Sequence, residues 1–120
     1  MTPTQAIDTY CAAWNETDPA RRAERLRTVW HDDATYTDPT VHTVGVDALV
    51  AHIGNVFERY PGSRIRRTSA IDTHHSVARF AWRKVLADGT ELPDGIDLAE
   101  FAADGRLRRI FGFFGPLRAA

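Results

Sequence analysis

The chain has 120 residues, 43% of them hydrophobic, which suits a single domain spanning residues 1–120 with one core. Its 15 basic and 16 acidic residues nearly cancel, so charge gives no reason to expect nucleic acid or an anionic membrane as partner. With one cysteine and no apolar run of about 20 residues, an internal disulfide and a membrane-spanning helix are excluded, and we expect a soluble, cytoplasmic protein.

Three helices are predicted in the first half of the chain. Thr2, Pro3 and Gln5 form a capping-box start for a helix that runs to about Glu16 and places Tyr10 and Trp14 on its buried side. Asp18 and Pro19 start a second helix in the same way. Its buried face is predicted from Ala23, Leu26, Val29 and Trp30, and the arginines among residues 21–27 are expected to face water.

A short extended segment, residues 34–38, is expected between the second and third helices, because Pro39 prevents a helix there. The third helix follows Gly45 and ends at Pro61-Gly62. Its apolar stripe is the strongest periodic signal in the chain: Val46, Leu49, Val50, Ile53, Val56, Phe57 and Tyr60.

From Arg64 onward the hydrophobic period changes to two, which predicts strands over about 64–71, 77–86, 95–102 and 107–114. Asp88-Gly89 and Asp104-Gly105 are turn dipeptides that join consecutive strands into antiparallel hairpins. The helices precede the strands along the chain, and no helical crossovers connect the strands. This order predicts an α+β fold with an antiparallel sheet.

Asp38 is the first candidate for chemistry, because a short strand ends on this carboxylate and Pro39 stiffens the chain after it. A carboxylate fixed in this way suits proton transfer. The residues by themselves favour the other interpretation, an Asx turn that prepares the chain for proline, without excluding the first.

Asp97 is the second candidate and lies within a predicted strand. Its own face continues through Ala99 and Phe101, which would bury a carboxyl among apolar side chains and raise its pKa. If instead the face of Ile96, Leu98 and Glu100 is buried, Asp97 is solvated. The alternation is compatible with either orientation.

Other reactive side chains give weaker signals. Tyr10 alone is typical of a core tyrosine whose hydroxyl finds a partner, and Cys11 on the same stripe suits a small hydrophobic residue better than a nucleophile. The five histidines do not form a ligand set, with His52 expected on the polar side of helix three, so no metal site is predicted.

Taken together, three segments resemble the ketosteroid isomerase and SnoaL-like polyketide cyclase branch of the nuclear transport factor 2-like superfamily. The first is residues 10–15 on the first helix. The second comprises the short motifs at 32–35 and 38–39 after the second helix, and the third is Ile96-Asp97 in a later strand. The resemblance covers nearly the whole chain. It implies a cone-shaped fold in which three N-terminal helices pack on a strongly curved antiparallel sheet and enclose a pocket.

The resemblance also implies a chemistry that needs no cofactor. Asp38 would be the base, and Tyr10 with a protonated Asp97 would donate hydrogen bonds to the enolate oxygen of a small hydrophobic carbonyl compound. The reaction would be an isomerisation or an aldol cyclisation. Candidate substrate-binding walls are the aromatic residues and one histidine: Trp14, Trp30, His42, Phe57, Phe80, Trp82, Phe111 and Phe113.

A second hypothesis is a non-catalytic protein that binds a small hydrophobic ligand or acts as a dimeric scaffold. The two hypotheses differ in whether Tyr10, Asp38 and Asp97 converge in one cavity. A homodimer is expected in either case, because the last strand is predicted to expose Ile110 and Phe114 on the face opposite Leu107, Phe111 and Phe113.

Overall fold

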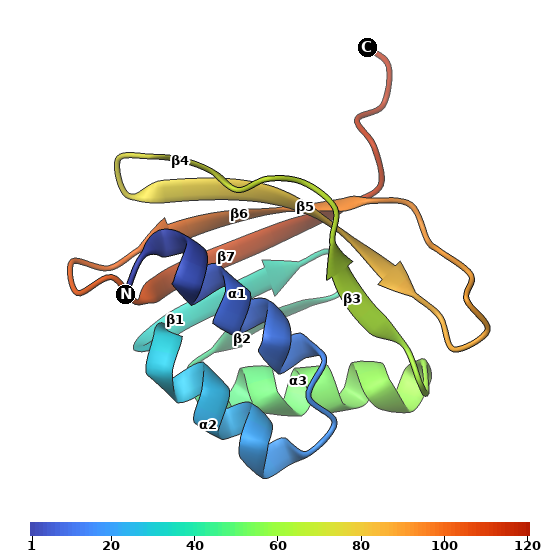
Figure 1. Cartoon of the computed structure of the whole chain (residues 1–120), viewed down its shortest axis with the longest axis horizontal. Helices are drawn as coiled ribbons and strands as arrows, with labels where there is room; N and C mark the ends of the chain where they lie inside the picture. The colour runs from blue at the N-terminus through green and yellow to red at the C-terminus, as the bar shows by residue number, and fades with distance from the viewer.

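The computed structural model describes residues 1–120 and contains three helices and a seven-stranded sheet (Figure 1). The helices lie in the first half of the chain, as the hydrophobic periods predict. In chain order the elements are α1 Pro3–Trp14, α2 Pro19–Val29, β1 Trp30–Asp38, β2 Val41–Val44, α3 Val46–Arg59, β3 Arg64–Arg67, β4 Asp72–His74, β5 Val77–Val85, β6 Gly95–Phe101 and β7 Leu107–Phe114.

The starts of α1 and α2 follow the predicted capping chemistry. Thr2 accepts a hydrogen bond from the backbone N–H of Gln5, and the Gln5 side chain accepts one from the N–H of Thr2. Asp18 accepts from the N–H of Arg21 and so caps α2. None of the helices has the length and hydropathy of a membrane-spanning segment.

The sheet has the order β2-β1-β7-β6-β5-β3, and β4 also pairs with β5. Strands β5, β6 and β7 form the predicted antiparallel meander, but β1 pairs with β7 in parallel, so the sheet is mixed. The prediction of a wholly antiparallel sheet is therefore wrong at this pair. Turn dipeptides specify the direction of strands that hairpins join, and no hairpin joins β1 to β7.

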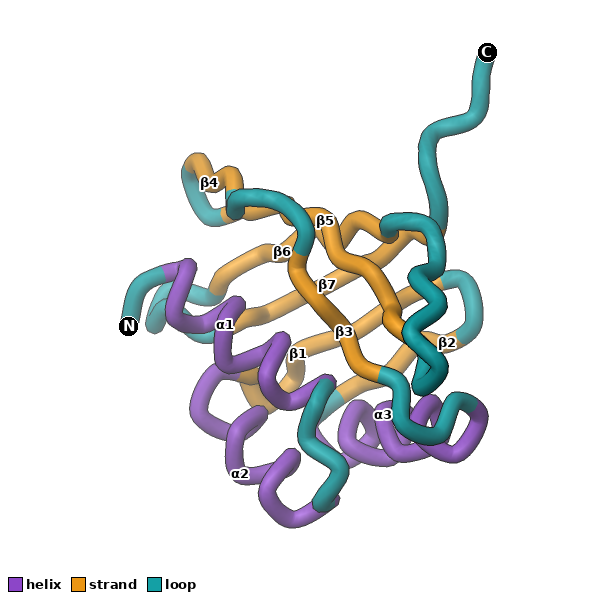
Figure 2. The backbone as a smooth tube through the Cα atoms, turned by 45° about the vertical axis from the view of Figure 1, so that its right-hand side comes forward, coloured by secondary structure: helices purple, strands orange, loops and turns teal.

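All three helices lie on one side of the curved sheet, and the last residues of the chain extend away from it (Figure 2). The core fills the space between these layers and includes Ile7 and Tyr10 from α1, Leu26 from α2 and Ile53 from α3. The strand predicted at 64–71 is observed only as far as Arg67, and the short strand β4 begins at Asp72.

The orientation of β7 differs from the prediction. Leu107 and Ile110 are both fully buried against the helices, and Phe113 is 61% exposed on the other face of the sheet. The register between β6 and β7 shifts at Glu100/Phe101, because Arg108 is an extra residue that breaks the alternation after Leu107. The prediction that Ile110 faces outward, with Phe111 and Phe113 inward, is therefore wrong.

Arg22 is buried, although the sequence predicted that it faces water. It is 2% exposed, whereas the other arginines of α2 are exposed as predicted. Its guanidinium donates to the backbone carbonyls of Glu16, Thr17 and Val50 at 2.9, 3.2 and 2.9 Å and lies 5.3 Å from the centre of the Phe57 ring. This side chain joins the α1–α2 loop to α3, a role that only the packing of the helices creates.

Candidate functional site

A pocket lies between α1 and the inner face of the sheet. Its volume is about 310 Å³, much of which is open to solvent. Seven of the eight lining residues are hydrophobic, and the eighth is an aspartate. The lining residues are Tyr10, Cys11 and Trp14 from α1, Tyr36 from β1, Ile65 from β3, Phe80 and Trp82 from β5, and Asp97 from β6.

Asp97 is 5% exposed, which decides the orientation that the sequence left open. Its strand face is the inner one, shared with Ala99, and the Trp82 indole donates to its Oδ1 at 2.9 Å. Burial raises the pKa of Asp97 to about 7, with the charge of Asp38 adding to the increase and the hydrogen bond from Trp82 opposing it. The carboxyl thus keeps its proton to a much higher pH than an ordinary aspartate does.

Two glycines make room for this hydrogen-bonded pair. A Cβ atom at Gly112 would lie 2.7 Å from Oδ1 of Asp97, and one at Gly95 would lie 2.4 Å from the ring of Trp82. Each glycine is the register partner of the residue it accommodates. A glycine inside a strand is a sequence signal for close approach of another group, and it could have marked these positions.

Tyr10 lies in the same pocket, stacked on Trp30 with ring centres 5.7 Å apart. Its hydroxyl is buried and has no hydrogen-bond partner within the chain. Burial, together with the charge of Asp97, raises the pKa of Tyr10 well above its ordinary value, so the hydroxyl keeps its proton. An unpaired buried donor of this kind is costly unless a ligand accepts from it.

Asp38 does not line the pocket. Its Oδ1 accepts from the N–H and hydroxyl of Thr40, at 2.7 Å each, and from the N–H of Val41 at 3.1 Å, which is the Asx-turn arrangement. Its Oδ2 accepts from the Tyr36 hydroxyl at 2.6 Å. Burial would raise the pKa of Asp38, but His52 and these hydrogen bonds outweigh it and hold the pKa well below its ordinary value.

The sequence prediction missed His52 and Tyr36, which link Asp38 to the pocket. The His52 ring packs on Trp14 and Tyr36, with centres 5.9 and 5.7 Å apart, and its Nε2 lies 3.7 Å from Oδ2 of Asp38. The expectation that His52 faces water is wrong, because its spacing from Leu49 and Val56 puts it on the buried stripe. Tyr36 alternates with Ala34, which also marks it as an inner residue.

Only some of the residues predicted to form the pocket wall lie in the pocket. Trp14, Phe80 and Trp82 line the pocket, Trp30 lies behind Tyr10, and Phe57 lines a neighbouring cavity. His42 is exposed and hydrogen-bonds Thr37, and Phe111 and Phe113 lie on the opposite face of the sheet. These last three were therefore wrongly assigned to the pocket. For Phe111 and Phe113 the reason is the bulge in β7, which reverses their expected faces.

The remaining reactive groups add little to the site. Burial, with the charge of Asp97, raises the pKa of Cys11 to about 12, so the thiol is not a nucleophile at neutral pH. No group of three or more His, Cys, Asp and Glu side chains is arranged to hold a metal ion. Asp97, Tyr10 and the Asp38–Tyr36 pair are the polar groups that the site offers.

Comparison with known proteins identifies relatives of this chain in sequence and in fold. Residues 7–110 match the family model of the SnoaL-like domain, and no curated protein matches the sequence. Among solved structures, a protein from Agrobacterium tumefaciens str. C58, named as a candidate isomerase of the SnoaL-like family, is 30% identical with a TM-score of 0.89. The match covers 94% of this chain and 97% of that one.

Two more distant structures share the fold. A nuclear transport factor 2-like protein of unknown function from Exiguobacterium sp. 255-15 is 20% identical, with a TM-score of 0.69 over 93% of this chain and 99% of that one. A candidate SnoaL-like polyketide cyclase from Jannaschia sp. CCS1 is 15% identical, with a TM-score of 0.68 over 92% and 85%. The chain therefore belongs to the SnoaL-like domain family.

Proposed function

We propose that this protein catalyses an enolisation-type proton transfer on a small apolar carbonyl compound bound between α1 and the sheet. The observation that carries the proposal is Asp97, a buried carboxyl whose pKa of about 7 suits it to give and take a proton at neutral pH. The apolar wall suits the hydrocarbon body of such a compound.

Tyr10 would hold the substrate oxygen. Its buried hydroxyl lacks a partner, and its raised pKa keeps it a donor, so a carbonyl oxygen would satisfy it. As the α-hydrogen leaves as a proton to Asp97, negative charge grows on that oxygen and strengthens the hydrogen bond from Tyr10. In an isomerisation, protonated Asp97 would return the proton to another carbon. In an aldol closure, the enolate carbon would attack a second carbonyl group, and the alkoxide formed there would take the proton from Asp97.

This assignment gives Asp38 a different role from the one the resemblance implied. A carboxylate that accepts four hydrogen bonds and has a strongly lowered pKa is a weak base, and Asp38 lies outside the pocket wall. We therefore propose that Asp38 is a positioning residue: it accepts a hydrogen bond from the Tyr36 hydroxyl and so holds the Tyr36 ring in place. The group that transfers the proton would be Asp97.

Deuterium exchange tests both assignments. In heavy water the protein should speed exchange of the α-hydrogens of 2-tetralone, followed by proton NMR. Asp97→Asn should lower the rate by roughly 100-fold or more, and Tyr10→Phe by roughly tenfold or more. Asp38→Asn, checked for folding by circular dichroism, should keep most of the rate. Loss of exchange in Asp38→Asn with retention in Asp97→Asn would reverse the roles of the two carboxyls.

Binding without catalysis is the alternative function, and one observation favours it: Asp97 is the single acidic residue of the pocket wall, so no separate base faces it. A planar phenol such as 2-naphthol mimics an enolate and should quench the fluorescence of Trp14 and Trp82 in either case. Saturable quenching without any acceleration of exchange would identify a binding protein instead of an enzyme.

A further inference from the structure

The three tryptophans of the chain differ in what their indole N–H groups contact. An indole is a largely apolar ring, but its N–H is a hydrogen-bond donor that needs an acceptor when it is buried. In Trp82 this N–H donates to Oδ1 of Asp97 at 2.9 Å. The N–H groups of Trp14 and Trp30 are buried and have no partner within the chain. Of these two residues, only Trp14 lines the pocket that contains Asp97.

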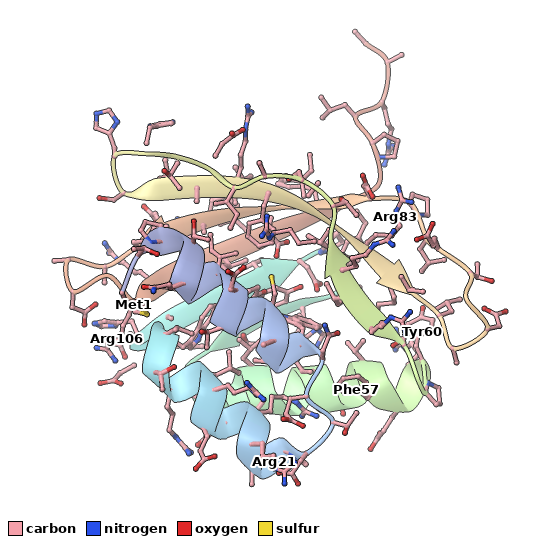
Figure 3. The ribbon with its side chains drawn as sticks, in the orientation of Figure 1. Met1, Arg21, Phe57, Tyr60, Arg83 and Arg106 are labelled. Atoms are coloured by element: carbon pink, nitrogen blue, oxygen red, sulfur yellow. The ribbon has the colours of Figure 1, made fainter.

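The indole of Trp14 lies near the unpaired hydroxyl of Tyr10. The two residues are four positions apart on α1 and share one face of the helix, in the layer of side chains between α1 and the sheet that Figure 3 draws as sticks. Their ring centres are 6.5 Å apart in an edge-on arrangement. Burial and the charge of Asp97 raise the pKa of Tyr10, whereas the N–H of Trp14 opposes this increase, as a donor close to the hydroxyl oxygen does. Two buried donors without partners therefore lie in one pocket.

The rings around Trp14 restrict its movement. Tyr36 and His52 pack on its indole with ring centres 5.4 and 5.9 Å away. The Tyr36 hydroxyl donates to Oδ2 of Asp38 at 2.6 Å, and Nε2 of His52 lies 3.7 Å from the same oxygen. Because Asp38 holds both neighbours, the indole of Trp14 is already in place before a ligand binds. A donor fixed in advance is the kind that stabilises a developing negative charge most effectively.

We propose that the indole N–H of Trp14 is a second hydrogen-bond donor, beside the Tyr10 hydroxyl, to the carbonyl oxygen of the compound bound in this pocket. A buried donor without a partner is costly, and one carbonyl oxygen has two lone pairs with which to accept from both groups. A ketone oxygen only accepts, so it matches two donors better than a water molecule, which brings two protons of its own. The inference rests on the proposed function for the class of ligand, but it does not depend on proton transfer by Asp97.

Proton–nitrogen NMR of the three indole N–H groups tests this inference in the wild-type protein. We expect 2-tetralone to move the proton signal of the Trp14 N–H downfield, because a hydrogen bond to oxygen deshields the proton, and to leave the Trp30 signal nearly unchanged. The matched ligand control is 2-methylenetetralin, which has the same rings with a CH₂ group in place of the oxygen. It reproduces the ring-current effect of the ketone and should not produce the downfield shift.

An isosteric replacement measures what the N–H contributes. In Trp14→benzothienylalanine a sulfur atom replaces the N–H and the shape of the ring is kept. Affinity for 2-tetralone should fall about tenfold, whereas affinity for 2-methylenetetralin should not change. The ligand-free variant should be at least as stable in urea as the wild type, because an unpaired buried donor has been removed. Trp30→benzothienylalanine removes the other unpaired N–H, outside the pocket, and should bind both compounds like the wild type.

Equal effects of the ketone and the hydrocarbon on the Trp14 signal, or wild-type affinity for 2-tetralone in Trp14→benzothienylalanine, would each overturn the inference. Deuterium exchange separates it from the proposed function. If 2-tetralone binds with the expected Trp14 shift but its α-hydrogens exchange no faster, the proposed function fails and the second donor stands. If exchange is catalysed and the Trp14 variant keeps the wild-type rate and affinity, the second donor alone is wrong. Failure of 2-tetralone to bind the wild type would overturn both.

Discussion

At the scale of single residues, the buried carboxyl of Asp97 links the site to the stability of the fold. Its folded pKa of about 7 lies above the ordinary value of an aspartate, so the folded state binds a proton that the unfolded chain releases. Between about pH 4 and pH 7 the free energy of unfolding should therefore fall as pH rises, by at most roughly 4 kcal/mol. Above pH 7 the loss is complete.

Asp97→Asn should abolish this pH dependence and raise stability at neutral pH, because the amide oxygen can still accept from Trp82 and carries no charge. Urea unfolding at pH 5 and pH 8 measures the effect. A wild-type protein that is as stable at pH 8 as at pH 5 would show that Asp97 titrates normally. Asp38 acts in the opposite direction, since its lowered pKa contributes stability that is lost as pH falls below its unfolded value.

The glycine opposite Asp97 gives a second prediction at this scale. In Gly112→Ala the new Cβ would meet Oδ1 of Asp97 at 2.7 Å, so the carboxyl must move away from Trp82. We expect a loss of about 1–3 kcal/mol in unfolding free energy. In an Asp97→Ala background the same substitution should cost clearly less, and a double-mutant cycle measures that coupling. Additive effects would mean that the two residues do not restrict each other.

At the scale of elements, Arg22 joins parts of the chain that pack against each other only in the folded state. Three hydrogen bonds from one buried guanidinium satisfy carbonyls of the α1–α2 loop and of α3. Arg22→Met keeps much of the side-chain volume but leaves those carbonyls unpaired, so it should cost about 3 kcal/mol or more. Arg21→Met, next to it and exposed, should change stability by less than about 0.5 kcal/mol in the same chemical unfolding experiment.

At the scale of the whole molecule, the outer face of the sheet remains without cover in a single chain. Ile96 and Phe113 are 41% and 61% exposed there and are register partners on β6 and β7. Homodimerisation through this face therefore stays a prediction, now with different residues from those the sequence suggested. Phe113→Lys should yield a folded monomer by light scattering where the wild type is dimeric. A monomeric wild type at micromolar concentration would contradict it.

Much of this protein could be predicted from its sequence because the signals are local. Capping residues at Thr2 and Asp18, the stripe of α3 and the turns at Asp88-Gly89 and Asp104-Gly105 each depend on neighbours within a few positions. Together they specify three helices followed by an antiparallel meander. The α+β class follows from that order, and the resemblance of residues 10–15, 32–35, 38–39 and 96–97 implied the family.

Only the tertiary structure decided the features that depend on long-range contacts. The parallel pairing of β1 with β7, the extra residue at Arg108 and the burial of Arg22 each depend on segments far apart in the chain. The site depends on such contacts as well. The register between β6 and β7 makes Asp97 face the core, and the carboxylate of Asp38 is hydrogen-bonded within the turn that follows β1. Periodicity gives a strand two faces, but packing against the helices chooses which of them is buried.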